Sequence, residues 1–424
     1  MPSPAAVAAR VGRAGGSGRP AALVLCAAVV VVLSAAACSS GSSSSGGVAS
    51  AASAGGTSGS AAAAGGGVIN VGVIGGFSGT QASSADPAEQ GIQAWAASVN
   101  AAGGLAGHKV NLIIKDDQDS ASLGIADAKE LVTQDKVAAV LADWSNTDIQ
   151  WGPYLKQQGV PIIGGANLAE SLQDSDYFPV GTDGNSQATV MMEAAAKAGV
   201  TKLAVPYCSE APACAEVDSL VKASQAASGV KVSWAGGFSQ TAPSYTAQCL
   251  AAKNSGANGM FIAAASEADV RFATACAQQG YKPIEVTLGS TATPDWAQVP
   301  AFNGMVDAIL DAPWTDTTTP ATQAFHAAMA KYEPGKQLGT GTMQAWVAGV
   351  AFAQAYKDAG SPANPTPADI VKGLYTFHDE TLGGLAPPLT YTKGQPGKVP
   401  CAFIISIQNG KFSEPQGLTT TCAT

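Results

Sequence analysis

The sequence feature that most limits the possible folds is a short apolar run. This run stops at a glycine-rich loop, which leads into a helix. Residues 68–74 are rich in β-branched side chains and residues 75–79 contain three glycines, as expected of a buried parallel strand and the turn after it. The next segment predicts a helix with Asp86 as its N-cap, Pro87 at its first position and Glu89 at its third, the pattern of a capping box. This order predicts an open α/β sheet.

The same alternation continues along the chain in two series. The first series has predicted strands at 110–114, 137–141 and 159–163 and a helix at 122–135. The second has predicted strands at 202–206, 230–234, 259–263, 284–288 and 304–310, interleaved with helices at 217–226, 245–253 and 267–279. A further helix is predicted at 342–359 and a last strand at 401–407. The two series predict two doubly wound parallel sheets, each at the centre of one lobe.

The length of 424 residues favours two domains over one core. The first 37 residues hold three arginines and then an apolar segment at 21–37, which is typical of a secretory signal and shorter than the ~20 residues that a membrane span needs. Removal of these arginines leaves 19 basic against 31 acidic residues, a net charge of −12. With this charge we expect no nucleic-acid partner.

Cys38 follows small residues in a pattern similar to the lipobox, whose cysteine is acylated and becomes the mature N-terminus. Ala35 stands where that pattern prefers leucine, so ordinary cleavage after Ala37 stays open, as does a retained membrane helix. Residues 39–67 are a Ser/Gly/Ala tract with the composition of a flexible tether. We expect a protein anchored by its lipidated cysteine to the outer face of the cell membrane.

Six further cysteines follow the tether, and an even number in an exported chain predicts disulfides. Fifteen pairings exist for six cysteines. We predict the sequence-local pairing, because Cys249 and Cys276 flank a single strand unit. The predicted pairs are Cys208 with Cys214, Cys249 with Cys276 and Cys401 with Cys422. The chain lacks a C-x-x-C motif and its three histidines are scattered, so we expect neither a metal site nor a cofactor.

Three motifs of the first series together resemble a known family. The sequence G-x-x-S-G at 75–79, N-A-x-G-G-x-x-G at 100–107 and the doublet at 116–117 resemble, in order and spacing, the leucine/isoleucine/valine-binding type of solute-binding protein, the extracytoplasmic receptor of an ABC importer. The resemblance extends from residue 68 to near residue 397. It implies the periplasmic binding protein type 1 fold, in which two lobes joined by three crossings close around a solute by hinge motion.

The resemblance also divides the chain and implies where the solute binds. The first lobe would comprise residues 68–182 and 312–382, and the second residues 183–311 and 383–424. In the first lobe, the hydroxyl position after the third strand falls on Asn146 beside Ser145, and the backbone-contact position falls on Ala166 beside Asn167. Without the resemblance, Ser145 is simply a predicted helix cap.

The second lobe departs from the family pattern. Amino-acid binders place an acid after the strand at 284–288 to pair with the solute's ammonium, but this chain has Gly, Ser and Thr291 there. Glu267, beside Ser266, is a candidate replacement, and its alternative role is a solvent-facing residue in a first helical turn. Because an unpaired buried ammonium is strongly unfavourable, amino acids, amides and carboxylates all stay open as solutes.

Aromatic residues complete the expected site. Phe77 and Trp144 would supply apolar wall, although Trp144 would equally fit a core or a lobe interface, and Tyr207 follows a second-lobe strand and would stack on a solute. These residues suit binding rather than catalysis.

No enzyme is expected, because the chain lacks G-x-S-x-G, H-E-x-x-H, a Walker A sequence and a complete G-x-G-x-x-G. The main prediction is a monomeric receptor that binds a small amino-acid-like, carboxylate or amide solute and works with a membrane-bound ABC permease. A sensory module of the same fold is the first alternative, and a secreted hydrolase is the second.

Overall fold

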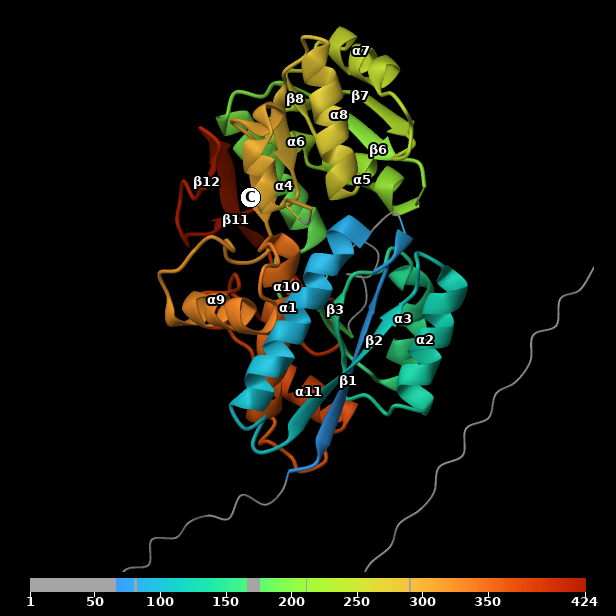
Figure 1. Ribbon diagram of the computed structural model, residues 1–424, viewed down its shortest axis with the longest axis vertical. Helices are drawn as coiled ribbons and strands as arrows, with labels where there is room; N and C mark the ends of the chain where they lie inside the picture. Colours follow the sequence, from blue (N-terminus) through green and yellow to red (C-terminus); the bar gives the residue numbers. More distant parts are fainter. Residues whose placement is uncertain (1–65, 80–81, 166–175, 211, 290) are drawn as a thin grey trace, which may run out of the picture. The chain divides into compact units, whose positions relative to one another are not determined.

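The computed structural model describes residues 66–79, 82–165, 176–210, 212–289 and 291–424 (Figure 1). All of these residues belong to the compact unit Ala61–Thr424. Cys38, Ala166 and Asn167 lie outside the described residues. Within the described part, no helix is both long enough and apolar enough to span a membrane.

The first sheet is parallel and has the strand order β2-β1-β3-β4-β5. Its strands are β1 (Val68–Gly75), β2 (Lys109–Asp116), β3 (Val140–Asp143), β4 (Ile162–Gly165) and β5 (Tyr177–Phe178). Its helices are α1 (Ala82–Ala101), α2 (Ala121–Thr133), α3 (Asp148–Gln158), α9 (Pro320–Tyr332), α10 (Thr340–Asp358) and α11 (Pro367–Leu374). We call this sheet with its helices lobe 1. Figure 1 shows α2 and α3 on one face of the sheet and α1 and α10 on the other.

The second sheet has the order β12-β11-β10-β9-β8-β6-β7. Its parallel strands are β6 (Lys202–Cys208), β7 (Lys231–Phe238), β8 (Gly259–Met260), β9 (Ile284–Thr287) and β10 (Val306–Ile309). The strands β11 (Cys401–Gln408), β12 (Lys411–Ser413) and β13 (Thr421–Cys422) pair antiparallel. Its helices are α4 (Gly184–Lys197), α5 (Pro212–Ala223), α6 (Gln225–Ser228), α7 (Thr246–Asn254), α8 (Ser266–Gln278), and the short 3-10 helices η3 (Pro294–Gln298) and η4 (Pro300–Phe302). We call this part lobe 2.

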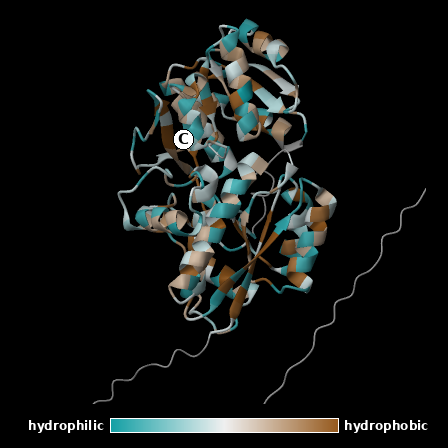
Figure 2. Cartoon of the chain, viewed as in Figure 1, coloured by the Kyte–Doolittle hydropathy of each residue, from teal (hydrophilic) through white to brown (hydrophobic). Residues whose placement is uncertain are grey.

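The expected fold class of two α/β lobes is confirmed, with an antiparallel edge on the second sheet. Figure 2 shows hydrophobic residues concentrated on interior strands such as β1. Two glycines let α1 and α10 pack closely. A Cβ on Gly349 would lie 2.2 Å from Cδ2 of Trp95, and a Cβ on Gly91 would lie 2.2 Å from the carbonyl oxygen of Thr342. Any larger side chain at these two positions would push the helices apart.

The predicted start of helix α1 is wrong. The helix begins at Ala82 and continues through Pro87, so Asp86 is inside it and is not the N-cap. Ser84 and Ala85 in the added turn are buried, and the Ser84 hydroxyl accepts a hydrogen bond from the backbone N–H of Ser266 in lobe 2. This packing offsets the helix hydrogen bond that a proline cannot donate.

All three predicted cysteine pairs are disulfides in the structure. The first joins the end of β6 to α5, the second joins α7 to α8, and the third joins the paired strands β11 and β13. Every one of them links elements of lobe 2.

Three crossings of the chain connect the lobes. The backbone N–H of Thr182 donates to Leu310 (3.3 Å), and that of Asp183 donates to Val399 (2.9 Å), so the crossings are hydrogen-bonded to one another. The expected lobe boundary at residue 383 stays a prediction, and the segment between this residue and Val399 contacts lobe 1. The Tyr391 hydroxyl still donates to the carbonyl oxygen of Pro179 beside β5 (2.7 Å), so this segment packs on lobe 1.

Candidate functional site

Loops at the carboxyl ends of strands from both sheets meet in the structure. The backbone N–H of Ser266, at the start of α8, lies 3.3 Å from the Ser84 hydroxyl of α1. The Thr340 hydroxyl, at the start of α10, donates to the carbonyl oxygen of Ala292 after β9 (3.0 Å). Ligands of open α/β sheets bind at the carboxyl ends of the strands, so the candidate site lies where these loops meet.

Ser145 is occupied by contacts within lobe 1. Its buried hydroxyl donates to the Asp117 carboxylate and accepts from the backbone N–H of Thr147 (3.0 Å) and the indole N–H of Trp151 (3.1 Å). Its own backbone N–H donates to Asp143 (3.0 Å). The residue that caps α3 is Thr147. These bonds hold the loop after β3 in place, and a solute contact by the Ser145 hydroxyl stays a prediction.

Asn146 is half-buried and points to the neighbouring loop. Its side-chain amide donates to the Asp119 carboxylate (3.1 Å). Burial, together with the nearby Asp117 carboxylate, raises the pKa of Asp119 to about 6. The amide and this weakly acidic carboxyl are therefore the polar groups that lobe 1 presents together at the loops after β2 and β3.

Phe77 and Trp144 both lie beside Gly75, and the apolar wall that they would form for a solute stays a prediction. The ring of Phe77 covers Gly75, where an added Cβ would lie 2.6 Å from its Cζ atom. Gly75 also forms an isolated parallel bridge with Trp144. The indole N–H of Trp144 is buried without a hydrogen-bond partner among the described residues. It is a donor available at this wall.

The four residues of lobe 2 that were predicted to bind the solute differ from one another in burial and hydrogen bonding. Ser266 is buried, and its hydroxyl accepts from the indole N–H of Trp296 (2.9 Å). Glu267 is exposed in the first turn of α8, which matches its alternative role as a solvent-facing residue. The Thr291 hydroxyl donates to the buried Asp269 (3.2 Å), so an acid does lie beside the loop after β9. Tyr207 lies on β6, half-buried over Gly237.

Sequence reasoning missed two polar residues at the second crossing. Asp311 and Gln344 line a cavity together with Leu310, Ala312, Thr340 and Met343. Asp311 is 3% exposed, and neither of its carboxylate oxygens has a partner among the described residues. Burial raises its pKa well above the ordinary value. The only signal in the sequence was an acid within the apolar stretch 308–314.

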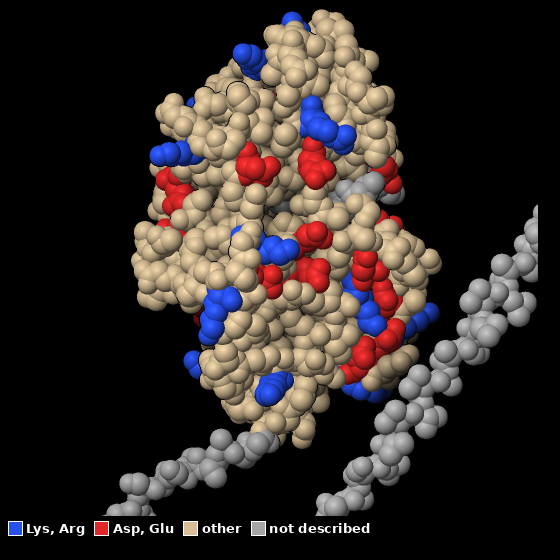
Figure 3. Space-filling model, viewed as in Figure 1, with Lys and Arg blue, Asp and Glu red and all other residues tan. Residues whose placement is uncertain are grey.

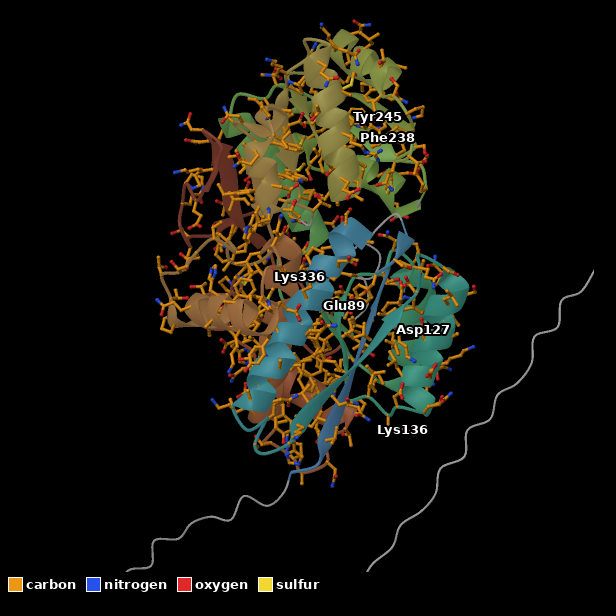
Figure 4. The ribbon with its side chains drawn as sticks, in the orientation of Figure 1. Glu89, Asp127, Lys136, Phe238, Tyr245 and Lys336 are labelled. Atoms are coloured by element: carbon orange, nitrogen blue, oxygen red, sulfur yellow. A yellow bond between two sulfur atoms is a disulfide. The ribbon has the colours of Figure 1, made fainter. Side chains whose placement is uncertain are left out.

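Acidic side chains also surround the outside of the site. Figure 3 shows more acidic than basic groups around the middle of the visible face. Burial and the nearby Asp86, Asp116 and Glu333 carboxylates raise the pKa of Glu89, which Figure 4 shows on α1. Burial likewise raises the pKa of Asp86, although Lys336 opposes the shift. The rim of lobe 1 therefore disfavours an anion.

Further acids are buried inside lobe 2. Burial raises the pKa of Asp269, Glu285 and Asp307 well above their ordinary values. Asp269 and Glu285 line a second cavity, which has room for about one water molecule. Among the described residues no cluster of three His, Cys, Asp or Glu side chains is arranged to hold a metal ion.

The sequence matches the periplasmic binding protein family over residues 68–411, and the chain belongs to that family. The family and its structural neighbours are solute-binding proteins and not enzymes. Family members are extracytoplasmic, bind small-molecule solutes and work with ABC transporter permeases. The family resemblance inferred from the sequence is therefore confirmed.

Several solved structures share the fold. An extracellular ligand-binding receptor from Verminephrobacter eiseniae is 22% identical (TM-score 0.70, covering 82% of this chain and 99% of that chain). A solute-binding protein of an ABC transporter from R. palustris in complex with 4-hydroxybenzoate is 18% identical (0.68, 84% and 97%). A branched chain amino acid ABC transporter from Thermus thermophilus with bound valine is 15% identical (0.73, 82% and 95%). None of the curated proteins compared with the chain matches it.

Proposed function

We propose that this protein is the solute receptor of an ABC importer and binds a small amino-acid-like molecule between its two lobes. The observation that carries the proposal is the meeting of strand-end loops from both sheets, through Ser84 with Ser266 and Thr340 with Ala292. Three hydrogen-bonded crossings lie beside this meeting point, so a small rotation there opens or closes the loops around a solute.

The charge of the site supports a solute that is not simply an anion. Acids gather at the rim of lobe 1 and beside the loop after β9, whereas the hydroxyl and backbone N–H of Ser145 in the loop after β3 are bonded internally. The negative charge of these acids favours the binding of a zwitterionic amino acid, its amide or an amine over that of a free carboxylate. The neighbours with bound valine and bound 4-hydroxybenzoate show that the fold accepts both classes of solute.

We further propose that Cys38 carries a lipid and that the Ser/Gly/Ala tract tethers the receptor to the membrane. The lipobox-like sequence before Cys38 and the composition of residues 39–67 support this. Replacing Cys38 with Ala should release the protein from the membrane fraction, and unchanged membrane association would argue against lipidation.

A thermal-shift screen of residues 61–424 tests the receptor function. This unit contains every described element and all three disulfides. The panel would contain amino acids, their amides, the corresponding amines and small carboxylic acids. A solute at about a hundred times its dissociation constant should add about 2.7 kcal/mol to the free energy of unfolding. No shift with any member of the panel would count against the proposed function.

A further inference from the structure

The second crossing ends in a carboxyl group that the described part of the protein leaves unpaired. Asp311 follows directly after the strand β10 region, is 3% exposed, and has both oxygens without hydrogen-bond partners among the described residues. Buried acids are normally paired or hydrogen-bonded, because an isolated buried charge is strongly unfavourable. A partner supplied from outside the chain would account for an acid at this position.

Gln344 places a third acceptor in the same cavity. Its side-chain N–H donates to the carbonyl oxygen of Gly165, at the end of β4, and the side chain is 2% exposed. Because a carbonyl can only accept, the amide nitrogen must face Gly165 and the amide oxygen must be the opposite end. That oxygen also has no partner among the described residues. The cavity thus holds three unsatisfied acceptors from Asp311 and Gln344.

The cavity lies between the two loops that the family resemblance assigns to the solute. Gln344 is bonded to Gly165, which directly precedes Ala166, and Thr340 is bonded to Ala292, which directly follows Thr291. The space is too narrow for a water molecule as the lobes stand in the structure. A solute group can enter only when the crossing that carries Asp311 moves.

We propose that Asp311 and Gln344 form a subsite for the solute's ammonium group. A primary ammonium has three N–H donors and one positive charge, which match three acceptors and one carboxylate in a cavity whose lining contains no basic side chain. The subsite supplies the acid that is absent after β9. The inference rests on the proposed function and narrows the solute to an amino acid or a primary amine.

Calorimetric titration of Asp311→Asn tests the subsite. The probes are L-amino acids, the acids that lack their α-ammonium, and the amines that lack their carboxylate. The wild type should bind an amino acid or an amine and bind its deaminated analogue at least about 100-fold more weakly. The affinity of Asp311→Asn for the ammonium solute should be at least about 100-fold lower than that of the wild type. Its melting temperature should equal or exceed that of the wild type.

Asp307→Asn is the matched control, because Asp307 lies on β10 just before Asp311, is 0% exposed and has two oxygens without partners among the described residues, but does not line the cavity. It should bind within about threefold of the wild type. Gln344→Leu removes one neutral acceptor and should weaken the binding of ammonium solutes about tenfold. This variant tests the subsite if Asp311→Asn does not fold. Equal binding by Asp311→Asn and wild type, or a wild-type preference for deaminated acids, overturns the subsite. A wild type that binds no probe overturns the proposed function itself.

Discussion

Ser145, in the loop after β3, shows how one hydroxyl can hold a loop in place through several hydrogen bonds. Ser145 accepts two hydrogen bonds and donates a third, so it connects Asp117, Thr147 and Trp151. The sequence located this loop correctly, because the strand before it is apolar and the next helix begins soon after. It did not show where the hydroxyl points, since a cap residue and a ligand residue are both serines at a helix start.

Replacement of Ser145 with Ala should destabilise the protein by about 1–3 kcal/mol, because Asp117 and the indole N–H of Trp151 would each lose a buried partner. Urea unfolding of the variant measures the change. Ser122→Ala is the control, since Ser122 is exposed and its hydroxyl contacts only the nearby Ser120. If both variants unfold at the same urea concentration, the network around Ser145 does not stabilise the fold.

The buried acids mark the limit of residue-level prediction. Asp269 and Asp311 are single acids in otherwise unremarkable segments, and no spacing or motif distinguishes them from surface acids. Their burial results from contacts between segments far apart in the chain, such as the approach of α10 to the second crossing. Glu267, which the sequence singled out, is exposed, and the acid beside Thr291 is two residues further on.

At the scale of elements, the central contact of lobe 1 is the packing of α10 on α1. The sequence predicted α10 closely, with 342–359 expected and Thr340–Asp358 found, because its apolar residues repeat with helical spacing. The start of α1 was predicted five residues too late, at Pro87 rather than Ala82, because local capping patterns carry no information about burial against another lobe. Helix ends are decided partly by such tertiary contacts.

Gly349→Ala should destabilise the protein by about 1–3 kcal/mol, because the added methyl group would overlap the indole of Trp95. Chemical denaturation measures the effect. Gly152→Ala is a matched helical control: its added Cβ would meet only Ile162 at an ordinary 3.8 Å, so the better helix propensity of alanine should stabilise α3 by up to about 1 kcal/mol. Equal effects of the two substitutions would show that the α1–α10 contact accommodates the added methyl group without a loss of stability.

At the scale of the whole molecule, alternating strands and helices were enough to predict two α/β lobes, and the motifs at 75–79, 100–107 and 116–117 were enough to predict the family. The prediction of parallel strands was wrong at the edge of the second sheet, where β11 to β13 pair antiparallel. These strands follow the third crossing, and their direction depends on where the chain re-enters lobe 2 rather than on their own residues.

The protein should be more stable at mildly acidic pH than at neutral pH. Burial raises the folded-state pKa of five carboxyl groups well above the ordinary value, namely those of Asp143, Asp269, Glu285, Asp307 and Asp311. The folded protein therefore holds protons that the unfolded chain releases above its ordinary carboxyl pKa, near 4, and stability falls as pH rises from there through the folded values. Melting temperatures measured from pH 5 to pH 8 should decrease.

Asp307→Asn removes one of these groups and should flatten the decrease, which separates the buried acids from the general repulsion of an acidic chain. A melting temperature that rises between pH 5 and pH 8 would contradict the assignment of raised pKa values to these five groups.

The discontinuity of lobe 1 has a consequence for secretion. Strands β1 to β4 come first in the chain, but α10, which packs against β3 and β4, comes more than 170 residues later, after the parallel strands of lobe 2. A chain that emerges from its N-terminus exposes one apolar face of this sheet until residues 340–358 have also crossed the membrane. During that interval the exposed apolar surface is prone to aggregation, and lobe 2 can acquire its disulfides at Cys208–Cys214 and Cys249–Cys276 before lobe 1 is complete.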